Sequence, residues 1–390
     1  MISVDEALSK VLALTTVTRS EEIALKDGRG RVLAEPAHAL LTQPPFDAAS
    51  MDGYAIRAED AGGALRVIGE AAAGRPWDGA AEPGSAVRIF TGAPVPEGFD
   101  TVVMQENTAR EGDTLRLTEP PRARHIRAKG SDFTQGARFD PARPLTGRDL
   151  GLLAAMNIAR LRVRARPRVA VLPGGDELVP PGAEPGPGQI ICSNDVAVAA
   201  IAASAGADAV CLPIATDTEE DLRARLTEAA AFDLIVTIGG ASVGDHDLIG
   251  RVTEGFGMER SFYKIAMRPG KPLIAGRIGQ AAMIGLPGNP VSSIVCAEIF
   301  IRPLLRAMLG LPPEDRLREG VLGRDLPAEG PRTHYLRARL SGGAPATVTP
   351  FEDQDSARLA LMSQADALLV RPAGEAALKA GARMVYLPLD

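Results

Sequence analysis

A stretch near the middle of the chain joins an apolar run to glycines and two carboxylates. Residues 233–247 have the sequence DLIVTIGGASVGDHD. The β-branched run before Gly239 predicts a buried strand, and the glycines predict a tight loop after it. Glycine lets backbone amides approach a ligand closely, so this loop suits a phosphate or another oxyanion, and Asp245 and Asp247 could hold a cation beside it. An ordinary α/β turn has the same features, and the loop alone does not separate the two interpretations.

Several common catalytic motifs are excluded at this loop. The G-x-x-x-x-G-K-[ST] phosphate motif needs a lysine, and none follows Gly244. The G-x-G-x-x-G dinucleotide motif fails because Ala241 stands at its middle glycine. A serine or cysteine nucleophile is poorly supported, since no G-x-S-x-G occurs and His246 is the one histidine close to these residues.

Positive charge follows shortly after the glycine loop. Residues 264–272 have the sequence KIAMRPGKP, in which Lys264, Arg268 and Lys271 surround a Pro-Gly turn. So apolar and turn-rich a segment favours anion binding over a solvated surface. Further on, Asn289 as N-cap and Pro290 at the first helical position predict a helix start with unpaired N–H groups. Together with the glycine loop, these features predict a site for a polyanion with Mg²⁺ and chemistry on a phosphoanhydride or another oxyanion.

Carboxylates follow other expected strands. Asp176 and Glu177 come after the strand that begins at Arg168, and Asp217 comes after the next strand. Ligands of a doubly wound sheet bind beyond the carboxyl ends of its strands, so these side chains are expected together at one edge, where they suit Mg²⁺. Two of them have a plainer interpretation, with Asp217 as a helix N-cap and Asp176 as a turn former.

The pattern of apolar residues places these groups on elements. From Arg168 to about Leu309 strands and helices alternate, which is typical of a doubly wound α/β domain. Three of its strands are expected at 262–267, 273–278 and 281–286, and the last leads into a long helix. Before this domain, a capping box at Ser3 to Glu6 opens an amphipathic helix.

The remaining segments are rich in glycine and proline. Between Gln43 and Gly136 they separate short apolar runs, which predicts a β-rich insert. Thr146 is placed to cap a helix that ends at Asn157. From Leu317 onward short alternating runs predict a small β-barrel or sandwich.

The overall composition excludes several classes of protein. The 390 residues have 45% hydrophobic content, a net charge of -6 and a pI near 5.5, so no nucleic-acid partner is expected. Three cysteines are an odd, widely spaced set that fits a reducing compartment. Without a signal-peptide pattern at the first residues, and without an apolar run of roughly 18 residues, we expect a cytoplasmic protein with no membrane partner.

Six motifs occur in an order that resembles one family. They are PFD at 45–47 with MDGY at 51–54, TGAPVP at 91–96, GDEL at 175–178, GGASVG at 239–244, RPGKP at 268–272 and LPGNPVS at 286–292. This ordered set, which spans nearly the whole chain, resembles the molybdopterin molybdenumtransferase family, the molybdenum insertases called MoeA in bacteria, which are similar to the E domain of gephyrin.

The resemblance implies an α/β multidomain fold and a homodimer. The expected domains are a discontinuous N-terminal subdomain (1–43 with 137–166), the β-rich insert (44–136), a doubly wound, molybdopterin-binding α/β domain (167–312) and a small C-terminal β-barrel (313–390). The α/β domain would carry the site and face the insert of the partner protomer.

The reaction implied by the resemblance inserts molybdate into adenylylated molybdopterin, with Mg²⁺-dependent loss of AMP. The implied catalytic residues are Asp52, Thr91, Asp132, Glu177, Asp217, Asp247 and Lys264, of which Glu177 and Asp247 would hold Mg²⁺. The implied substrate-binding residues are Gly239, Gly240, Ser242, Gly244, Arg268, Lys271, Pro287, Gly288, Asn289, Pro290 and Ser356. The molybdopterin adenylyltransferase is an implied partner.

The chain departs from the family pattern at two places. Pro173 and Gly174 precede Gly175 where family members often have Ser-Thr, so two hydroxyls are lost near the expected phosphates. Arg268 stands where some members have lysine, which keeps the charge but presents a planar fork. Two alternatives stay open, a molybdopterin adenylyltransferase that shares the α/β domain and a molybdopterin-binding scaffold without turnover.

Overall fold

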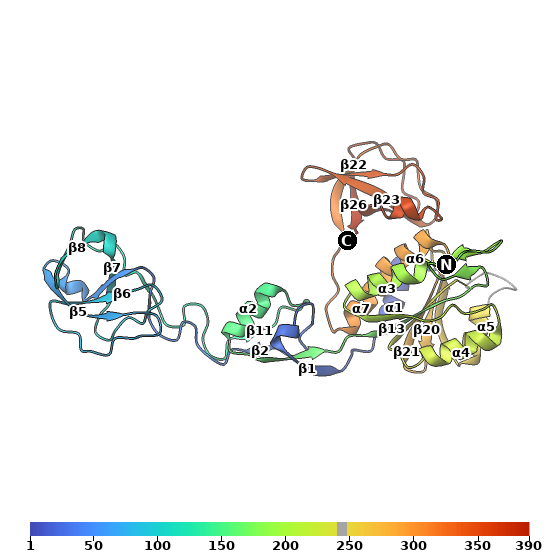
Figure 1. Cartoon of the computed structure of the whole chain (residues 1–390). Coiled ribbons are helices and arrows are strands. Elements are labelled where there is room, and N and C mark those ends of the chain that lie inside the picture. The colour runs from blue at the N-terminus through green and yellow to red at the C-terminus, as the bar shows by residue number, and fades with distance from the viewer. Residues whose placement is uncertain (240–247, 390) are drawn as a thin grey trace. The chain divides into compact units, whose positions relative to one another are not determined.

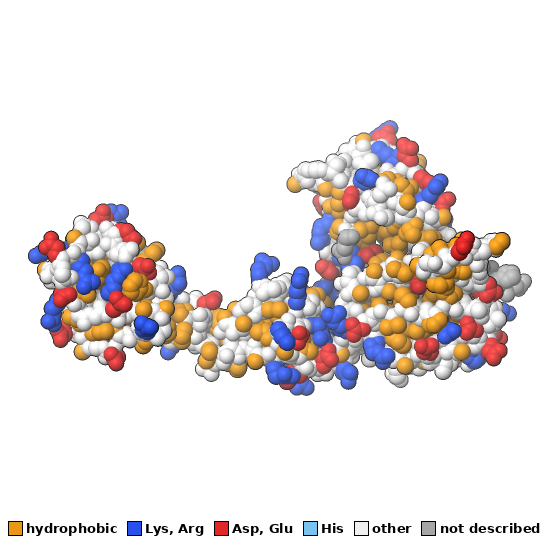
Figure 2. Space-filling model, viewed as in Figure 1, with side chains coloured by type: hydrophobic (Ala, Val, Ile, Leu, Met, Phe, Trp, Pro, Cys, Tyr) orange, Lys and Arg blue, Asp and Glu red, His pale blue; other side chains and the backbone are white. Residues whose placement is uncertain are grey.

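The computed structural model describes residues 1–239 and 248–389, and the chain forms two compact units. The first unit consists of Met1–Glu21 and Arg164–Asp390, and the second consists of Glu22–Val163. Figure 1 shows the elements of both units along the chain, and Figure 2 shows the types of side chain on the same face of the molecule. Among the described helices, none has the length and apolar character needed to cross a membrane.

The first unit contains a six-stranded sheet with the strand order β16-β13-β17-β21-β20-β18. The four strands from β16 to β21 are parallel, and β20 and β18 are antiparallel to their neighbours. Their bounds are β13 Arg168–Pro173, β16 Asp208–Cys211, β17 Leu234–Ile238, β18 Glu259–Lys264, β20 Pro272–Ile278 and β21 Ala281–Leu286. The expected α/β domain is therefore confirmed, and its glycine-rich segments follow the carboxyl ends of β13, β17 and β21.

Helices cover both faces of this sheet because the side chains of its central strands alternate between two cores. In β13, Val169 and Val171 point into a core shared with α1 (Val4–Leu12), α3 (Asn194–Ser204), α6 (Pro290–Cys296) and α7 (Arg302–Met308). Ala170 and Leu172 point into a second core shared with α4 (Glu219–Ala229) and α5 (Leu248–Gly255). Figure 1 shows α4 and α5 on one side of the strands and α1, α3 and α7 on the other.

Side chains cap the starts of α1 and α4, at Ser3 as the sequence predicts and at Thr218 in place of Asp217. Ser3 Oγ accepts a 3.1 Å hydrogen bond from the Glu6 amide at the start of α1. Thr218 Oγ1 accepts a 3.3 Å bond from the Asp221 amide at the start of α4. The long helix expected up to Leu309 is divided, because a π-helical segment at Ala297–Ile301 separates α6 from α7.

The bounds predicted for the strand at 262–267 are wrong. The strand β18 ends at Lys264, and Ile265 forms a bridge with Ile2 at the start of the chain. The next residues, Met267–Arg268, form β19, which pairs with the C-terminal sheet instead. This segment therefore leaves the α/β sheet before it reaches Arg268.

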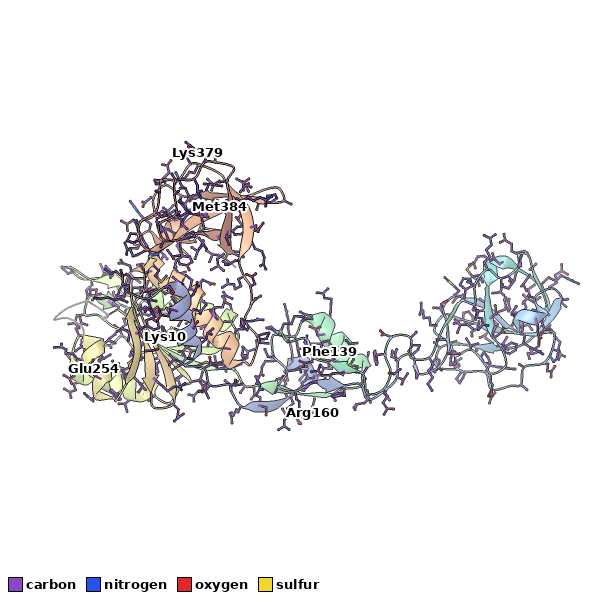
Figure 3. All side chains as sticks on the ribbon, turned by 180° about the vertical axis from the view of Figure 1, so that it is seen from behind. Lys10, Phe139, Arg160, Glu254, Lys379 and Met384 are labelled. Atoms are coloured by element: carbon purple, nitrogen blue, oxygen red, sulfur yellow. The ribbon has the colours of Figure 1, made fainter. Side chains whose placement is uncertain are left out.

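The C-terminal strands close into a small barrel, as expected. Their order is β19-β23-β24-β22-β26-β25, and an additional pairing of β23 with β25 closes the ring. The bounds are β22 Arg318–Leu322, β23 Thr333–Ser341, β24 Ala346–Pro350, β25 Ala367–Arg371 and β26 Arg383–Pro388, with a short helix α8 at Leu359–Met362. In Figure 3, Met384 marks the barrel and Lys10 marks α1.

The second unit holds two groups of elements. Its large sheet has the order β7-β4-β6-β5-β9-β8, formed by β4 Gly53–Ile56, β5 Ala64–Ala71, β6 Ser85–Ile89, β7 Thr101–Met104, β8 Thr108–Glu111 and β9 Thr114–Leu117. The other group surrounds helix α2 (Gly147–Ala155), and Phe139 and Arg160 in Figure 3 mark its strands. Its short strands are β1 Ser20–Ala24, β2 Ala37–His38, β11 Arg138–Phe139 and β12 Arg160–Arg164, and β3 Ala48–Ala49 pairs with β10 Ile126–Arg127.

Helix α2 begins and ends at the residues that the sequence indicates. Thr146 and Asp149 form a reciprocal capping box at its start. Asn157 follows its end with a φ of 63°, in the left-handed region. The α2 side chain Leu153 is fully buried in a core with Leu161 and Val163.

The four-domain division of the sequence stays a prediction. In the structure, Met1–Glu21 groups with the residues from Arg164 onward. The reason is that Val4, Ala7 and Val11 of α1 pack into the core of the α/β sheet.

Candidate functional site

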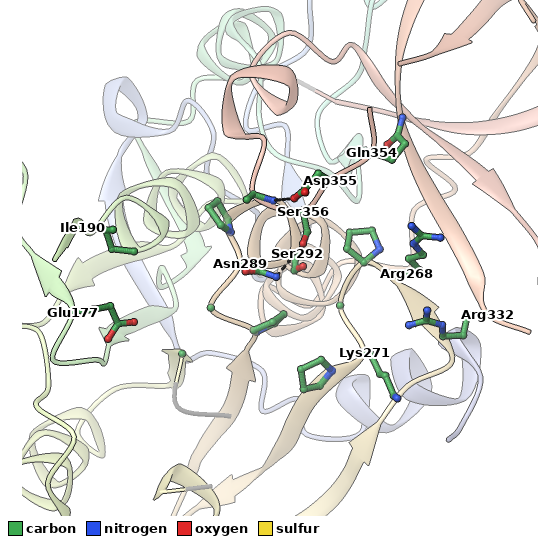
Figure 4. A pocket seen from close by; sticks show the side chains of 18 residues that line it. Glu177, Ile190, Arg268, Lys271, Asn289, Ser292, Arg332, Gln354, Asp355 and Ser356 are labelled. Carbon is green, nitrogen blue, oxygen red and sulfur yellow. Dashed lines mark hydrogen bonds between the residues drawn. The ribbon is translucent and has the colours of Figure 1, made fainter. Parts of the chain in front are cut away.

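A cavity of about 990 Å³ opens between the α/β sheet and the C-terminal barrel, within the first unit. Figure 4 shows the side chains that surround it. The lining residues are Glu177, Ile190, Gly239, Arg268, Pro269, Gly270, Lys271, Pro272, Pro287, Gly288, Asn289, Pro290, Ser292, Arg332, Gln354, Asp355, Ser356 and Ala357. Every segment that the sequence predicts for oxyanion binding and that the structure describes therefore contributes to one cavity.

Three cations gather on one side of this cavity. Arg268 lies on β19 and Arg332 directly precedes β23, and these two strands pair in parallel with Arg268 opposite His334. Lys271 follows on the same wall, and Figure 4 shows Glu177 and Ile190 across the cavity from these three side chains. Guanidinium groups bind carboxylates and phosphates through paired N–H donors, so this wall is suited to an oxyanion.

Two glycines let the backbone of the cavity wall approach its neighbours. Gly270 has a φ of +108°, and a Cβ atom there would lie 2.6 Å from Sγ of the buried Cys296. Gly239 has a φ of +86°, and its Cβ would lie 2.7 Å from the carbonyl oxygen of Gly174. No other residue type fits either position without displacement of a neighbour.

The barrel contacts the α/β domain through the pairing of β19 with β23, through barrel side chains such as Tyr335 and Leu368 in the shared core, and through a loop that holds Ser356. Asn289 Nδ2 donates a 3.0 Å hydrogen bond to Ser356 Oγ, and the Val291 amide donates a 3.1 Å bond to the Ser356 carbonyl oxygen. Asn289 is the N-cap residue of α6, as expected, but its side chain turns to Ser356 instead of capping its own helix. At the neighbouring residue, Asn194 Nδ2 donates a 2.6 Å hydrogen bond to the carbonyl oxygen of Gly288.

Two of the carboxylates expected together at this edge of the sheet lie in different cavities. Glu177 lines the large cavity, whereas Asp217 lies in a small pocket beside Gly174 and Thr237. Asp217 pairs with Asp176, since the Asp217 amide donates to Asp176 Oδ1 at 3.0 Å and the Asp176 amide donates to Asp217 Oδ2 at 3.4 Å. Within residues 1–239 and 248–389, no group of three or more His, Cys, Asp or Glu side chains is arranged to hold a metal ion.

Asp52 and Thr91, which the sequence alone leaves in separate turns, meet at the end of two strands in the second unit. Gly53 of β4 pairs with Ile89 of β6 in antiparallel register, which brings Asp52, just before β4, close to Thr91, just after β6. The Thr91 amide and hydroxyl both donate to Asp52 Oδ1 at 2.8 Å. These hydrogen bonds favour the charged carboxylate and lower the pKa of Asp52 below its ordinary value.

The remaining predicted residues lie elsewhere. Asp132 is exposed on the second unit, where its amide donates to the Gln43 carbonyl oxygen at 3.1 Å. Lys264 ends β18 and does not line the large cavity. Gly240, Ser242, Gly244 and Asp247 lie outside the described residues, together with Asp245 and His246.

Sequence reasoning missed four polar residues of the cavity, Ser292, Arg332, Gln354 and Asp355. Three of them come from the barrel, and their sequence neighbourhood carries no glycine loop or cation cluster. Ser292 could have been found, because it stands two residues after Pro290 at the predicted helix start.

The first unit thus joins an α/β domain and a barrel around one cavity lined with cations, and the second unit is rich in β-strands. Three family profiles match successive parts of the chain, the MoeA N-terminal region (domain I and II) at residues 2–157, a probable molybdopterin binding domain at 170–307 and the MoeA C-terminal region (domain IV) at 319–389. The chain therefore belongs to the MoeA family.

Two relatives and a solved structure resemble the chain over nearly its full length. It is 36% identical to molybdopterin molybdenumtransferase 2 of Mycobacterium tuberculosis, over 98% of both chains. It is 34% identical to the molybdopterin molybdenumtransferase of Nostoc, over 95% of this chain and 89% of the relative. The crystal structure of a molybdopterin biosynthesis MoeA protein from Pyrococcus horikoshii matches with a TM-score of 0.87 at 29% identity, covering 100% of this chain and 99% of the other.

Proposed function

We propose that the chain is a transferase of molybdenum cofactor biosynthesis that inserts molybdate into adenylylated molybdopterin and releases AMP. The observation that carries the proposal is the cavity in which Arg268, Lys271 and Arg332 face Glu177. Relatives of the chain are named molybdopterin molybdenumtransferase, and the family profiles match its N-terminal, central and C-terminal parts.

The cations of the cavity bind the oxyanions of both substrates. Molybdate is a dianion, and the phosphate groups of adenylylated molybdopterin carry further negative charge. Arg268 and Arg332 offer planar pairs of N–H donors, and Lys271 offers a point charge beside them. In the proposal, the glycine loop that begins at Gly239 receives the substrate phosphates, and Pro287 to Pro290 line the oxyanion pocket.

Mg²⁺ fits this site through Glu177. Proteins bind Mg²⁺ through one or two carboxylates together with phosphate oxygens of the substrate, so a cluster of three protein ligands is not needed. Glu177 lies across the cavity from the cations, and Asp247 is the second ligand in the proposal. A bound Mg²⁺ would neutralise charge on the phosphoanhydride as AMP leaves.

The second unit supplies further groups from a partner chain. In the proposal, the protein is a homodimer in the cytoplasm, and Asp52, Thr91 and Asp132 of one subunit complete the cavity of the other. The pair of hydrogen bonds from Thr91 keeps Asp52 ionised, which suits a carboxylate that orients a water molecule or a cation. The molybdopterin adenylyltransferase is the proposed source of the substrate.

Two alternatives are less well supported. An adenylyltransferase that shares the α/β domain would need neither the insert nor the barrel, whereas this chain matches family profiles in both regions. A scaffold without turnover would not need Glu177 opposite a wall of cations.

The test is AMP release from adenylylated molybdopterin by the purified protein with Mg²⁺ and molybdate. We expect release to depend on both ions and to fall in Glu177→Gln and Asp247→Ala, while the exposed Lys379→Gln on the barrel leaves it unchanged. The proposal is wrong if the wild-type protein releases no AMP, or if both carboxylate variants release AMP as fast as the wild type.

A further inference from the structure

Arg337, which takes no part in the site described above, is one of the largest fully buried side chains of the chain. It lies on β23 with 1% of its surface exposed. A buried guanidinium is costly unless its N–H groups are paired, so the partners of Arg337 show what its burial stabilises.

These partners belong to a single loop. Arg337 Nη2 donates to the Asp353 carbonyl oxygen at 3.2 Å, and Nη1 donates to the Arg358 carbonyl oxygen at 3.0 Å. Its Nε atom donates to Gln354 Oε1 at 3.3 Å. One side chain therefore holds both ends of the segment from Asp353 to Arg358, which we call the 353–358 loop.

The amide of Gln354 completes the attachment to β23. Its Oε1 atom accepts a 3.0 Å hydrogen bond from the Arg337 amide, and its Nε2 atom donates to the carbonyl oxygens of Arg337 and Phe351, each at 3.0 Å. The side chain of Gln354 thus takes the place of a neighbouring strand just after β24 ends.

The middle of the 353–358 loop forms part of the cavity. Asp353 Oδ1 accepts from the Asp355 amide and Asp355 Oδ1 accepts from the Ala357 amide, both at 2.8 Å, so the turn is held internally. Between them, Ser356 contacts Asn289 and Val291 of the α/β domain. In Figure 4, Gln354, Asp355 and Ser356 lie on the barrel side of the cavity.

We propose that Arg337 is a positioning residue, which places the Ser356 hydroxyl against the phosphate-type oxyanion that the cavity binds. Arg337 does not line the cavity and acts through the 353–358 loop. The inference rests on the proposed function only for the nature of the natural ligand, since the geometry of the loop is independent of the reaction.

The test compares Arg337→Lys with Arg339→Lys. Lysine keeps the positive charge at position 337 but cannot reach three separate acceptors with one ammonium group. Arg339 lies two residues further on the same strand, is exposed and donates to Gln364, so it is a matched control. Inorganic phosphate serves as the probe, in a calorimetric titration of the full chain. We expect Arg337→Lys to weaken phosphate binding about tenfold and Arg339→Lys to leave it unchanged.

A double-mutant cycle with Ser356→Ala separates positioning from general destabilisation. If Arg337 acts through Ser356, the loss caused by Ser356→Ala in the wild type disappears in the Arg337→Lys background. Hydrogen exchange of the Val291 amide, which donates to Ser356, should become faster in Arg337→Lys only. Should Arg337→Lys not unfold cooperatively, Asp353→Ala replaces it with the same expected pattern, because Asp353 holds the turn through the Asp355 amide and does not line the cavity.

Any one of three results would overturn the inference. These are an unchanged phosphate affinity in Arg337→Lys, additive losses in the double-mutant cycle, and an equal loss of affinity in Arg339→Lys. The phosphate titration needs no turnover. If the protein releases no AMP but shows this binding pattern, only the proposed function is contradicted. If it releases AMP but does not show this binding pattern, only the positioning role is contradicted.

Discussion

The side chain of Asn289 donates a 3.0 Å hydrogen bond to the hydroxyl of Ser356, and this bond joins the start of α6 to the barrel loop that closes the cavity. The two residues are 67 positions apart in the sequence. Both line the same cavity, so their contact fixes its shape where two parts of the first unit meet.

Asn289→Asp should weaken anion binding more than Asn289→Ala. The aspartate has the shape of asparagine but brings a negative charge into the cavity, whereas alanine only removes the donor. We expect roughly a tenfold loss of phosphate affinity for aspartate and a few-fold loss for alanine. Titrations at low and high salt should show the larger salt dependence for the aspartate variant, and equal losses in both variants would contradict the electrostatic explanation.

Gly270→Ala should destabilise the first unit strongly. The substitution combines a φ of +108° with a 2.6 Å approach of the new Cβ to Cys296 Sγ. Gly279→Ala is a matched control, because Gly279 also has a positive φ, of +57°, but has no atom within 4 Å of the new Cβ.

Denaturant unfolding should show a loss of at least about 2 kcal/mol for Gly270→Ala and about 1 kcal/mol for Gly279→Ala. Similar losses in the two variants would mean that backbone conformation, and not the contact with Cys296, dominates.

A mixture of two inactive variants tests whether the site is shared between subunits. Asp52→Ala removes a group of the second unit, and Glu177→Ala removes a group of the first. In a homodimer with shared sites, a mixed dimer has one site with both substitutions and one intact site. With half of the dimers mixed, about a quarter of the wild-type AMP release should return after subunit exchange.

Each variant alone should remain inactive under the same exchange conditions. If no activity returns although light scattering shows dimers that exchange subunits, then the two groups act within one chain. A protein that is only monomeric in light scattering contradicts the shared site directly.

The stability of the barrel should fall as the pH decreases below about 6.5. Burial lowers the pKa of His334 below its ordinary value of 6.5, and Arg268 and Arg332 lower it further, against the opposing effect of Glu329 at 3.2 Å. Because the folded pKa is lower than the unfolded pKa, the unfolded chain takes up the proton first, so acid favours unfolding.

The variant His334→Gln retains a polar side chain but does not titrate. The free energy of unfolding of the wild type should decrease more steeply between pH 7 and pH 5 than that of the variant. A steeper decrease in the variant would show that His334 gains a proton more readily in the folded chain.

The sequence predicted the parts of the site that depend on local chemistry. Glycines with positive φ, such as Gly239 and Gly270, leave a clear signal because few other residues adopt that backbone. The N-cap position of Asn289 and the cation pair Arg268 and Lys271 were found for the same local reasons.

The contributions of the barrel were not predictable in this way. Arg332 enters the cavity because β19 pairs with β23, and nothing in residues 267–268 signals a partner more than sixty positions away. In the alternating run from Tyr335 to Leu340, the pattern favours an exposed Arg337. The 353–358 loop covers it instead, and its carbonyl oxygens make the burial tolerable.

The pairing of β19 with β23 also limits how the protein could be recombined. A chimera that exchanges only the barrel with a relative would join a foreign β23 to the native Met267–Arg268, and of the three cations Arg268 and Lys271 would come from one parent and Arg332 from the other. A junction placed at the apparent domain border near Pro312 would therefore take the residues of one cavity from two different proteins. A functional exchange would have to include residues 266–272 together with the barrel.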